Sequence, residues 1–577
     1  MKPHGAFRMF AKTLKSFNRK EEILSVLLVI LISLSGYNIA KSINDDLVPA
    51  RSNDNGEIAE EGGAYSEGLV GNVKRLNPLF TEFNSVDKDI ASLIFSGLSK
   101  YSPNEKKVVE DMATHTLSED KKTYTFIIRD NVFWHDGKPV TGEDVYFTYH
   151  DIIQNPNFKN SILRSNFEGI DIKLLDAKTI TFTLKNAHSF FFTNTTVGIL
   201  PKHILNNVPV EDLDKHEFNL HPIGSGPYML AEPVKNIEKN ENQIYLTLFP
   251  EYYGKKPHVK DLRFFTFATE EELFQAKNAL NGLSKITEIS EIEKLKKDGR
   301  YQLLSYSLPQ YTAVFFNMDS PILKNSSVRL GLSKAIDKKN LIQILGLKKQ
   351  IDTPLLELDQ ENWIHKFSIE QAMGSLFDAG WKFDEGEAEE GKIRKDRKGN
   401  ELTLNLITQS FSKNSMKQDE NEKTLKFLVD SWKKAGVKIQ VLRYEEEEFN
   451  AKIRNEHADY DMILAGQGMG YNLDTYSFWH SSQSNGKGLN LSNYKNPVVD
   501  NLIETIREIF QTETKETKLQ KLADQIQTDV PAIFLYSPEY YYAVDVKVKN
   551  ASLGSLAFPA DRLTNFLEWY IKEKKNS

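Results

Sequence analysis

Residues 124–145 read YTFIIRDNVFWHDGKPVTGEDV, and this stretch decides the fold more than any other part of the chain. Apolar and polar residues alternate over 124–128, which is typical of a half-buried strand. Asp136-Gly137 favours a tight turn, and Thr141 can cap a helix that begins directly after it. The stretch therefore predicts a strand, a turn and a capped helix, and we interpret His135-Asp136 as part of this local fold rather than as a catalytic pair.

Farther along, the chain alternates between strand and helix patterns. Leucines alternate with polar residues over 402–406, apolar residues recur at helical spacing from Leu425 to Gly436, and alternation resumes over 437–441. A strand, a helix and a strand in this order form a βαβ unit, and residues 460–465 offer another strand. This part of the chain is predicted to be α/β.

The length of the chain bounds its organisation. Its 577 residues exceed what one core supports, since single hydrophobic cores stop growing at about 250–300 residues. No long linker rich in proline or glycine and no internal repeat is visible within the body. We therefore expect two or three substructures that are joined by short hinges.

Charge and cysteine content exclude several classes of function. The 73 Lys and Arg residues against 80 Asp and Glu residues give a net charge of -7, which would repel a phosphate backbone, so no nucleic acid partner is expected. The chain has no cysteine, which excludes disulfides, thiolate nucleophiles and cysteine-ligated zinc. It also excludes the lipid-accepting cysteine of a bacterial lipoprotein.

The N-terminus carries a membrane signal. Residues 23–40, ILSVLLVILISLSGYNIA, contain no charge, and residues 1–20 contain six cations and no acid. By the positive-inside rule we expect a cytoplasmic basic tail at 1–22, a transmembrane anchor at 23–40 and a flexible stalk at 41–63. The alternative is a cleaved signal peptide, and in both cases the body is exported.

Motifs for catalysis are missing. Gly224-Ser225-Gly226-Pro227 lacks the spacing of a nucleophile elbow and is interpreted as a tight turn, and 466–471 has tyrosine where a dinucleotide loop needs its third glycine. No phosphate-binding loop and no His-Glu-x-x-His motif is present. We therefore expect no catalytic residue, no metal site and no cofactor.

Several short landmarks resemble one family of exported proteins. They are 76–80 (LNPLF), 93–98 (LIFSGL), 124–145, 201–205 (PKHIL), 224–228 (GSGPY), 252–257 (YYGKKP), 315–318 (FFNM) and 335–337 (AID). In this order they are similar to the peptide, dipeptide and nickel family of bacterial solute-binding proteins, family 5 of the extracellular binding components of ABC importers. The resemblance extends from about residue 65 to residue 560 of the chain.

This resemblance implies an α/β, two-lobed periplasmic-binding-protein (Venus flytrap) fold with an extra small subdomain. The implied parts are lobe I at 64–310, with the subdomain at about 101–214, lobe II at 311–534, and a return to lobe I at 535–577. It also implies a monomeric extracytoplasmic receptor that binds a peptide-like ligand between hinged lobes. The receptor would deliver the ligand to an ABC permease that a separate ATPase subunit drives.

The resemblance also suggests where a ligand would bind. Members that hold the free amine of a peptide commonly use the aspartate of a Trp-x-Ala-Asp-Tyr string. Gly470 stands at that position here, so the ion pair with the ligand amine is missing unless Asp474 reaches into the same space. In the glycine-rich stretch 466–470 the backbone can lie close to a ligand strand and hydrogen-bond with it like the edge of a sheet. The candidate ligand-binding residues are Gly468, Met469, Gly470, Tyr471, Asn472, Asp474, Trp479, Tyr311, Phe316 and Asn317. Packing is the alternative role for the aromatic ones.

Other functions stay open at this point. The lost aspartate brings a nickel complex or an oligosaccharide into consideration as the ligand. A membrane-tethered hydrolase would need carboxylates or histidines that converge with shifted pKa values. A surface scaffold or sensor could reuse the same lobes, and a neighbouring permease and ATPase in the genome would argue against it.

Overall fold

A computed structural model describes the body of the chain. It covers residues 63–571 except 83, 233, 235–242, 347, 357, 359–364, 385–391, 412–415, 456–459 and 472–473. The predicted basic tail at 1–22, the anchor at 23–40 and all of the predicted stalk but Gly63 lie outside the described residues. Within the described part, none of the helices combines the length and the apolar character needed to cross a membrane.

Residues 124–145 fold as predicted. Strand β5 (Thr123–Ile128) buries alternate side chains, and Gly137 takes the left-handed backbone conformation of the turn, with a φ of 83°. Helix α4 (Gly142–Tyr146) begins after Thr141, whose N–H and hydroxyl donate to Oδ2 of Asp144 at 2.9 and 3.0 Å. The cap and the turn therefore fix the angle between strand and helix.

A mixed sheet forms the centre of the first lobe, with the order β11-β1-β10-β9-β8. Strand β1 is parallel to both β10 and β11, and β9 turns the edge antiparallel. The strands are β1 (Ala64–Val70), β8 (Tyr228–Leu230), β9 (Gln243–Leu248), β10 (Asp261–Phe267), β11 (Gly282–Ile286) and β12 (Tyr301–Ser307). The helices beside them are α3 (Ser85–Ile94), α8 (Glu270–Ala276) and α9 (Ile289–Asp298).

A separate antiparallel sheet has the order β4-β5-β7-β6, next to a β2–β3 hairpin. The strands are β2 (Ser99–Ser102), β3 (Lys107–Glu110), β4 (Ala113–Leu117), β6 (Asp171–Leu174) and β7 (Thr179–Thr183). The helices are α5 (Ser161–Ser165), α6 (Phe191–Asn194), α7 (Lys202–Leu205) and the π-helix Phe147–Ile153. Side chains of this sheet, of the first-lobe sheet and of the C-terminal residues share one buried apolar cluster.

The second lobe contains the predicted βαβ unit. Strand β15 (Thr403–Gln409) is parallel to β16 (Lys438–Tyr444) and to β17 (Met462–Gly468), and α13 (Met416–Lys434) connects the first two. The other elements are β13 (Gln310–Phe316), β14 (Lys348–Gln350), α10 (Ser326–Lys334), α11 (Lys338–Leu345), α12 (Ile369–Asp378), α14 (Glu446–Ile453), α15 (Tyr476–Trp479), α16 (Pro497–Glu508) and α17 (Thr512–Asp529). Asn325 and Asp337 cap α10 and α11 through their side chains, which accept from the N–H groups of Ser327 and Asn340.

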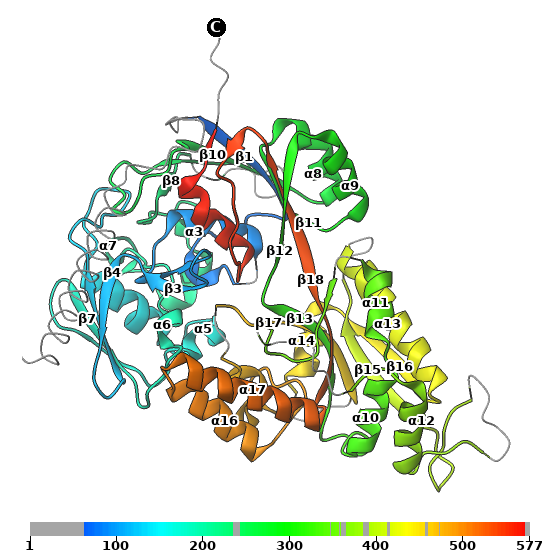
Figure 1. Ribbon diagram of the computed structural model, residues 1–577. Helices are drawn as coiled ribbons and strands as arrows, with labels where there is room; N and C mark the ends of the chain where they lie inside the picture. Colours follow the sequence, from blue (N-terminus) through cyan, green and yellow to red (C-terminus); the bar gives the residue numbers. More distant parts are fainter. Residues whose placement is uncertain are drawn as a thin grey trace, which may run out of the picture. The chain divides into compact units, whose positions relative to one another are not determined.

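One long strand belongs to the sheets of both lobes. Strand β18 (Ala532–Asp545) pairs with β13 near its beginning and with β11 and β12 near its end (Figure 1). Strands β12 and β13 follow each other directly and make the second connection, with a register shift in the pairing of β13 with β18 between Thr312 and Ala313. These two connections are where a hinge can act. The exact lobe boundaries stay a prediction.

The C-terminal residues return to the first lobe and close a buried ionic network. The 3-10 helix Pro559–Glu568 brings Arg562 against β1 and α3. The Arg562 guanidinium donates to Glu67 and, at 2.8 Å, to Asp89, and the side chains of Arg562 and Glu67 are fully buried. The hydroxyl of Tyr542 adds a hydrogen bond to Glu67 at 2.7 Å. The strands β19 (Val548–Lys549) and β20 (Tyr570–Ile571) form an antiparallel pair, and β20 is the last described element.

The glycines of 224–227 have a reason beyond a turn. The N–H of Gly226 donates to the carbonyl of Ile94, and the N–H of His135 donates to the carbonyl of Gly224, both at 2.8 Å. A Cβ atom added at Gly224 would lie 1.9 Å from the Ile94 oxygen. Backbone contact between this segment and the end of α3 is therefore what requires glycine here.

Candidate ligand-binding site

An open sheet edge lies at the end of β17. Strand β15 pairs with β17 only through residues 462–464, and no other described strand continues that side of the ladder. Gly466 and Gly468 are exposed, and a Cβ added at Gly468 would meet nothing within 4 Å. The opposite side of the strand is held by β13, where Gln310 pairs with Gly468. Within the described part of the chain, the end of β17 therefore offers unpaired backbone N–H and carbonyl groups next to free space, within the glycine-rich stretch that the sequence singled out.

The chain turns sharply after this edge. The N–H of Met469 donates to the carbonyl of Pro309 at 2.7 Å, and the Met469 side chain is buried in the second-lobe core. Gly470 has a φ of 71°, a left-handed conformation that glycine adopts without strain. Asn472, another predicted site residue, lies outside the described residues.

Tyr471 connects the two lobes. Its ring stacks on Tyr101 with centroids 4.9 Å apart and meets the ring of Phe558 edge-on at 4.8 Å. Its hydroxyl donates to Oδ1 of Asp561 at 3.0 Å. Burial raises the pKa of Asp561 to about 6, although the Tyr471 hydroxyl and the N–H groups of Phe558 and Ala557 oppose this shift. Tyr471 is thus a second-lobe side chain whose partners all belong to the first lobe.

Asp474 is engaged by its own lobe. The guanidinium of Arg507 donates to its carboxylate from Nε at 3.0 Å and from Nη2 at 2.9 Å, and it lies 3.8 Å from the ring centre of Tyr476. A ligand ammonium would have to compete with this two-point ion pair. Replacement of the missing amine-binding aspartate by Asp474 stays a prediction.

A first-lobe segment, residues 188–190, inserts into the second lobe next to this ion pair. The N–H of Ser189 donates to the carbonyl of Arg507 at 2.6 Å, and Nζ of Lys515 donates to the Ser189 hydroxyl at 2.8 Å. Phe190 packs in the apolar core of the second lobe, and Nε2 of His188 is 3.7 Å from Oδ2 of Asp474. The 188–190 segment therefore holds the lobes together at a second place, and no sequence motif marks it.

Acid should loosen the 188–190 segment. Burial lowers the pKa of His188 to about 4; Asp474 opposes this shift, and Arg507 and Lys515 add to it. An unfolded histidine titrates near 6.5, so the unfolded state binds more protons between these values and stability is lost as the pH falls from about 6.5 to 4. We expect His188→Gln to remove about 1–3 kcal/mol of this pH dependence in urea unfolding followed between the two pH values.

The matched control is His150→Gln, because His150 is exposed and lies outside the lobe contacts. His135 also has a pKa lowered by burial to about 4, so the wild-type curve keeps part of its slope in the variant. A His188→Gln curve parallel to that of the wild type would contradict the assignment.

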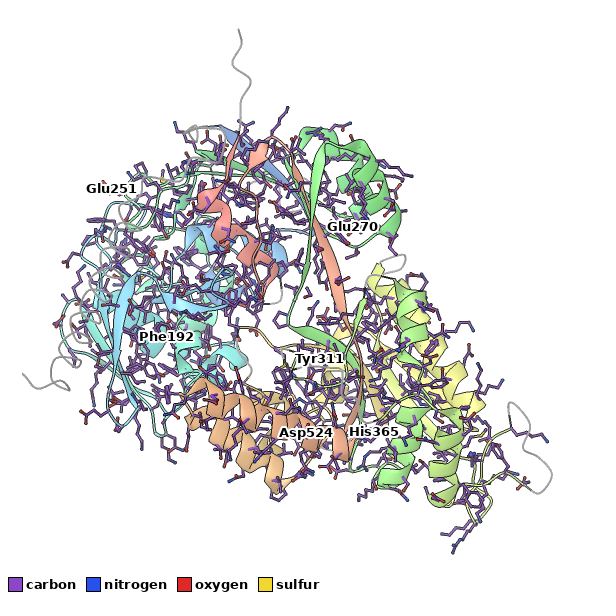
Figure 2. The ribbon with its side chains drawn as sticks, in the orientation of Figure 1. Phe192, Glu251, Glu270, Tyr311, His365 and Asp524 are labelled. Atoms are coloured by element: carbon purple, nitrogen blue, oxygen red, sulfur yellow. The ribbon has the colours of Figure 1, made fainter. Side chains whose placement is uncertain are left out.

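Four of the predicted site residues lie in the second-lobe core. The Tyr311 hydroxyl donates to Oε1 of Gln467 at 2.6 Å, and Asn317 donates to the carbonyl of Tyr460 at 2.9 Å (Figure 2 labels Tyr311 on β13). Phe316 is fully buried, and Trp479 is 1% exposed. Their partners here are core residues, and contact between these four and a ligand stays a prediction.

Sequence reasoning missed the polar side chains along the two connections between the lobes. Nε2 of Gln310 donates to the hydroxyl of Tyr540 on β18, and Lys348 pairs with Glu420 at 2.9 Å. Glu270, labelled in Figure 2 at the start of α8, has a pKa that burial raises to about 7. No motif in the sequence distinguishes these residues from other polar side chains on the surface. Their partners are far apart in the sequence, and only the folded structure brings them together.

Comparison with known proteins gives the family. Residues 107–489 match the model described as bacterial extracellular solute-binding proteins, family 5 Middle. The chain is 25% identical over 574 residues to the oligopeptide-binding protein AppA of Bacillus subtilis, and the match covers 95% of this chain and 98% of AppA.

Solved structures share the fold. AppA of Bacillus subtilis in complex with a nonapeptide matches with a TM-score of 0.70 and 23% identity, over 89% of this chain and 100% of the other. NikZ of Campylobacter jejuni with Ni(L-His) matches with a TM-score of 0.71 and 24% identity, over 88% and 99%. These likenesses show the two-lobed α/β fold of periplasmic binding proteins. Because the family model also covers more than half of the chain, the protein belongs to family 5 of the bacterial extracellular solute-binding proteins.

Proposed function

We propose that the chain is the receptor of an ABC importer, which binds a peptide-like ligand between its lobes and delivers it to a permease driven by a separate ATPase subunit. The observation that carries the peptide assignment is the open edge of β17 at Gly466 and Gly468. An extended peptide can add to such an edge through main-chain hydrogen bonds, which read no side chain. The similarity to AppA, a protein named for oligopeptide binding, supports the same ligand class.

Binding would be coupled to closure of the lobes. The hinge lies in the β12–β13 connection and in β18, so the lobes extend over 64–310 and 311–534, with 535–577 returning to the first. Tyr471 and the 188–190 segment supply contacts that exist only when the lobes meet. A ligand that touches both lobes adds to these contacts and shifts the population toward the closed form.

The chain would be held at the membrane by its N-terminus. The uncharged residues 23–40 follow a cationic tail at 1–22, and 41–63 would form the stalk that leads to a monomeric body outside the cytoplasm. Extraction of membranes with alkaline carbonate tests the anchor, because a spanning segment stays in the pellet and a cleaved protein is released.

Ligand recovery tests the function. Full-length protein, purified in detergent without refolding, is expected to show bound peptides by native mass spectrometry, since tight receptors retain their ligand. The peptides should be recovered intact, whereas a hydrolase would release fragments. Recovery of a metal complex or an oligosaccharide instead, with no thermal shift in a peptide library, would contradict the peptide assignment.

Tyr471 supplies a matched variant for the same assay. Tyr471→Ala removes two ring contacts and the hydrogen bond to Asp561, so we expect peptide affinity to fall roughly tenfold through loss of the closed form. Tyr471→Phe keeps the rings and should fall only about threefold. Equal affinity of Tyr471→Ala and wild type in calorimetric titration would show that this contact does not support closure.

A further inference from the structure

Lys285 has an unusual backbone for a lysine. It lies in β11, where the pairing with β18 shifts register between Leu283 and Ile286, and its φ is 54°. A bulge of this kind turns a side chain away from the direction that regular alternation would give it. Residues other than glycine pay free energy for a left-handed conformation, and such positions concentrate at functional sites.

The ammonium of Lys285 has no anionic partner among the described residues. Its nearest recorded contact is the ring of Tyr540, with Nζ 5.4 Å from the ring centre. Two carboxylates attract this ammonium without forming an ion pair with it: Oδ2 of Asp89 accepts from Arg562 at 2.8 Å, and Oε1 of Glu270 accepts from the N–H of Thr287 at 3.3 Å. Burial lowers the pKa of Lys285, which reflects the cost of keeping this charge away from water.

The second lobe supplies another cation, the exposed Lys417, whose charge acts on Lys285 without direct contact. The charge of Lys417, in the first turn of α13, also lowers the pKa of Lys285. The acid of that turn, Asp419, pairs with Lys423 at 2.6 Å, and the next residue, Glu420, pairs with Lys348 at 2.9 Å. Closure of the lobes therefore brings two like charges together, and an anion between them would turn this repulsion into attraction.

A chain of contacts links Lys285 to the residues beside Gly468. Gln310 pairs with Gly468 in the β13–β17 ladder and donates through its side chain to Tyr540, whose ring is the contact of Lys285. A ligand strand along Gly466–Gly468 would thus have one end or one side chain within reach of Lys285.

We infer that Lys285 is a specificity residue that binds a carboxylate of the ligand, supplied by an acidic side chain or by the C-terminus of a peptide. This inference rests on the proposed function and further specifies that the ligand carries a negative charge. The ammonium is held at the bulge as a preformed anion site, and Lys417 adds to the attraction when the lobes close. Peptides that present a carboxylate at this point are preferred over their neutral analogues.

Matched peptide pairs test the inference on full-length protein in detergent. The probes are short alanine peptides with a free C-terminus or a C-terminal amide, and peptides with glutamate or glutamine at each internal position. By isothermal titration calorimetry, wild type is expected to bind the charged member of at least one pair roughly 10- to 100-fold more tightly. Lys285→Met, which keeps the length of the side chain, should reduce that ratio to about threefold or less.

Two further variants complete the experiment. Lys285→Gln is a second neutral form in case the methionine variant is poorly folded, and Lys296→Met removes an exposed lysine of α9 that pairs with Glu293 and should leave the ratio unchanged. Without ligand, Lys285→Met should unfold at the wild-type temperature or above, because it removes a half-buried charge that has no ion-pair partner among the described residues.

The outcomes separate the inference from the proposed function. If wild type binds the panel without preferring charge, or if both Lys285 variants keep the preference, Lys285 does not select the ligand and the receptor function stands. If wild type binds no member of the panel, the peptide assignment is overturned, and this inference with it.

Discussion

Arg562→Met is expected to lower the free energy of unfolding by about 3–5 kcal/mol, because it leaves two carboxylates buried without their cation. Arg562 is fully enclosed and donates to both Glu67 and Asp89, while Tyr542 shares the Glu67 carboxylate. The network joins the first strand of the body to the C-terminal residues. Urea unfolding at pH 7 measures the loss through the midpoint at constant slope.

The exposed ion pair of Lys255 with Glu568 gives the control. Both side chains are about half exposed, so Lys255→Met should change stability by less than about 0.5 kcal/mol. Adding Glu67→Gln and Asp89→Asn to Arg562→Met removes the orphaned charges and should recover part of the loss. A loss below about 1 kcal/mol in the single variant would mean that water reaches the network and screens it.

Gly224→Ala is expected to cost about 3 kcal/mol, at the upper end of what one added methyl group causes in a packed interior. The new Cβ would overlap the carbonyl oxygen of Ile94 at 1.9 Å, and a backbone atom at the end of a helix cannot rotate away as a side chain can. Thermal unfolding of the two proteins shows the difference in midpoint.

Gly374→Ala controls for the loss of glycine itself. Gly374 lies exposed inside helix α12, and a Cβ atom added there would meet nothing within 4 Å, so alanine should raise stability by up to about 1 kcal/mol. Equal midpoints for the two variants would show that residues 224–226 yield to the added atom and do not press on α3.

Local periodicity predicted the elements that depend on neighbouring residues. The strand, turn and helix of 124–145 and the βαβ unit of β15, α13 and β16 formed where the pattern placed them. Each depends on a short repeat of apolar side chains or on a cap within three residues. Such signals are complete within a short window, so a single sequence is enough to read them.

The ligand-binding role of the site residues stays a prediction, and the contacts around them could not be predicted because the residues that make these contacts are far apart in the sequence. The sequence singled out the glycine-rich residues 466–470 at the end of β17, yet nothing local indicated that Tyr471 would stack on Tyr101 or that Phe190 would enter the core of the second lobe. An aromatic residue such as Trp479 can line a pocket or fill a core, and the sequence does not distinguish the two roles. In the structure Trp479 packs in the second-lobe core. The bulge at Lys285 depends on β18, which comes more than two hundred residues later.

The position of β18 has a consequence for biogenesis. This strand has neighbours on both sides at each end: β13 and β14 up to residue 538, and β11 and β12 from residue 539 onward. A ribosome supplies the chain from the N-terminus at about 5–20 residues per second, so neither lobe can complete its sheet until the last tenth of the protein has been made. A growing chain that cannot finish folding stays unfolded, and an unfolded chain is what a translocation channel can transport.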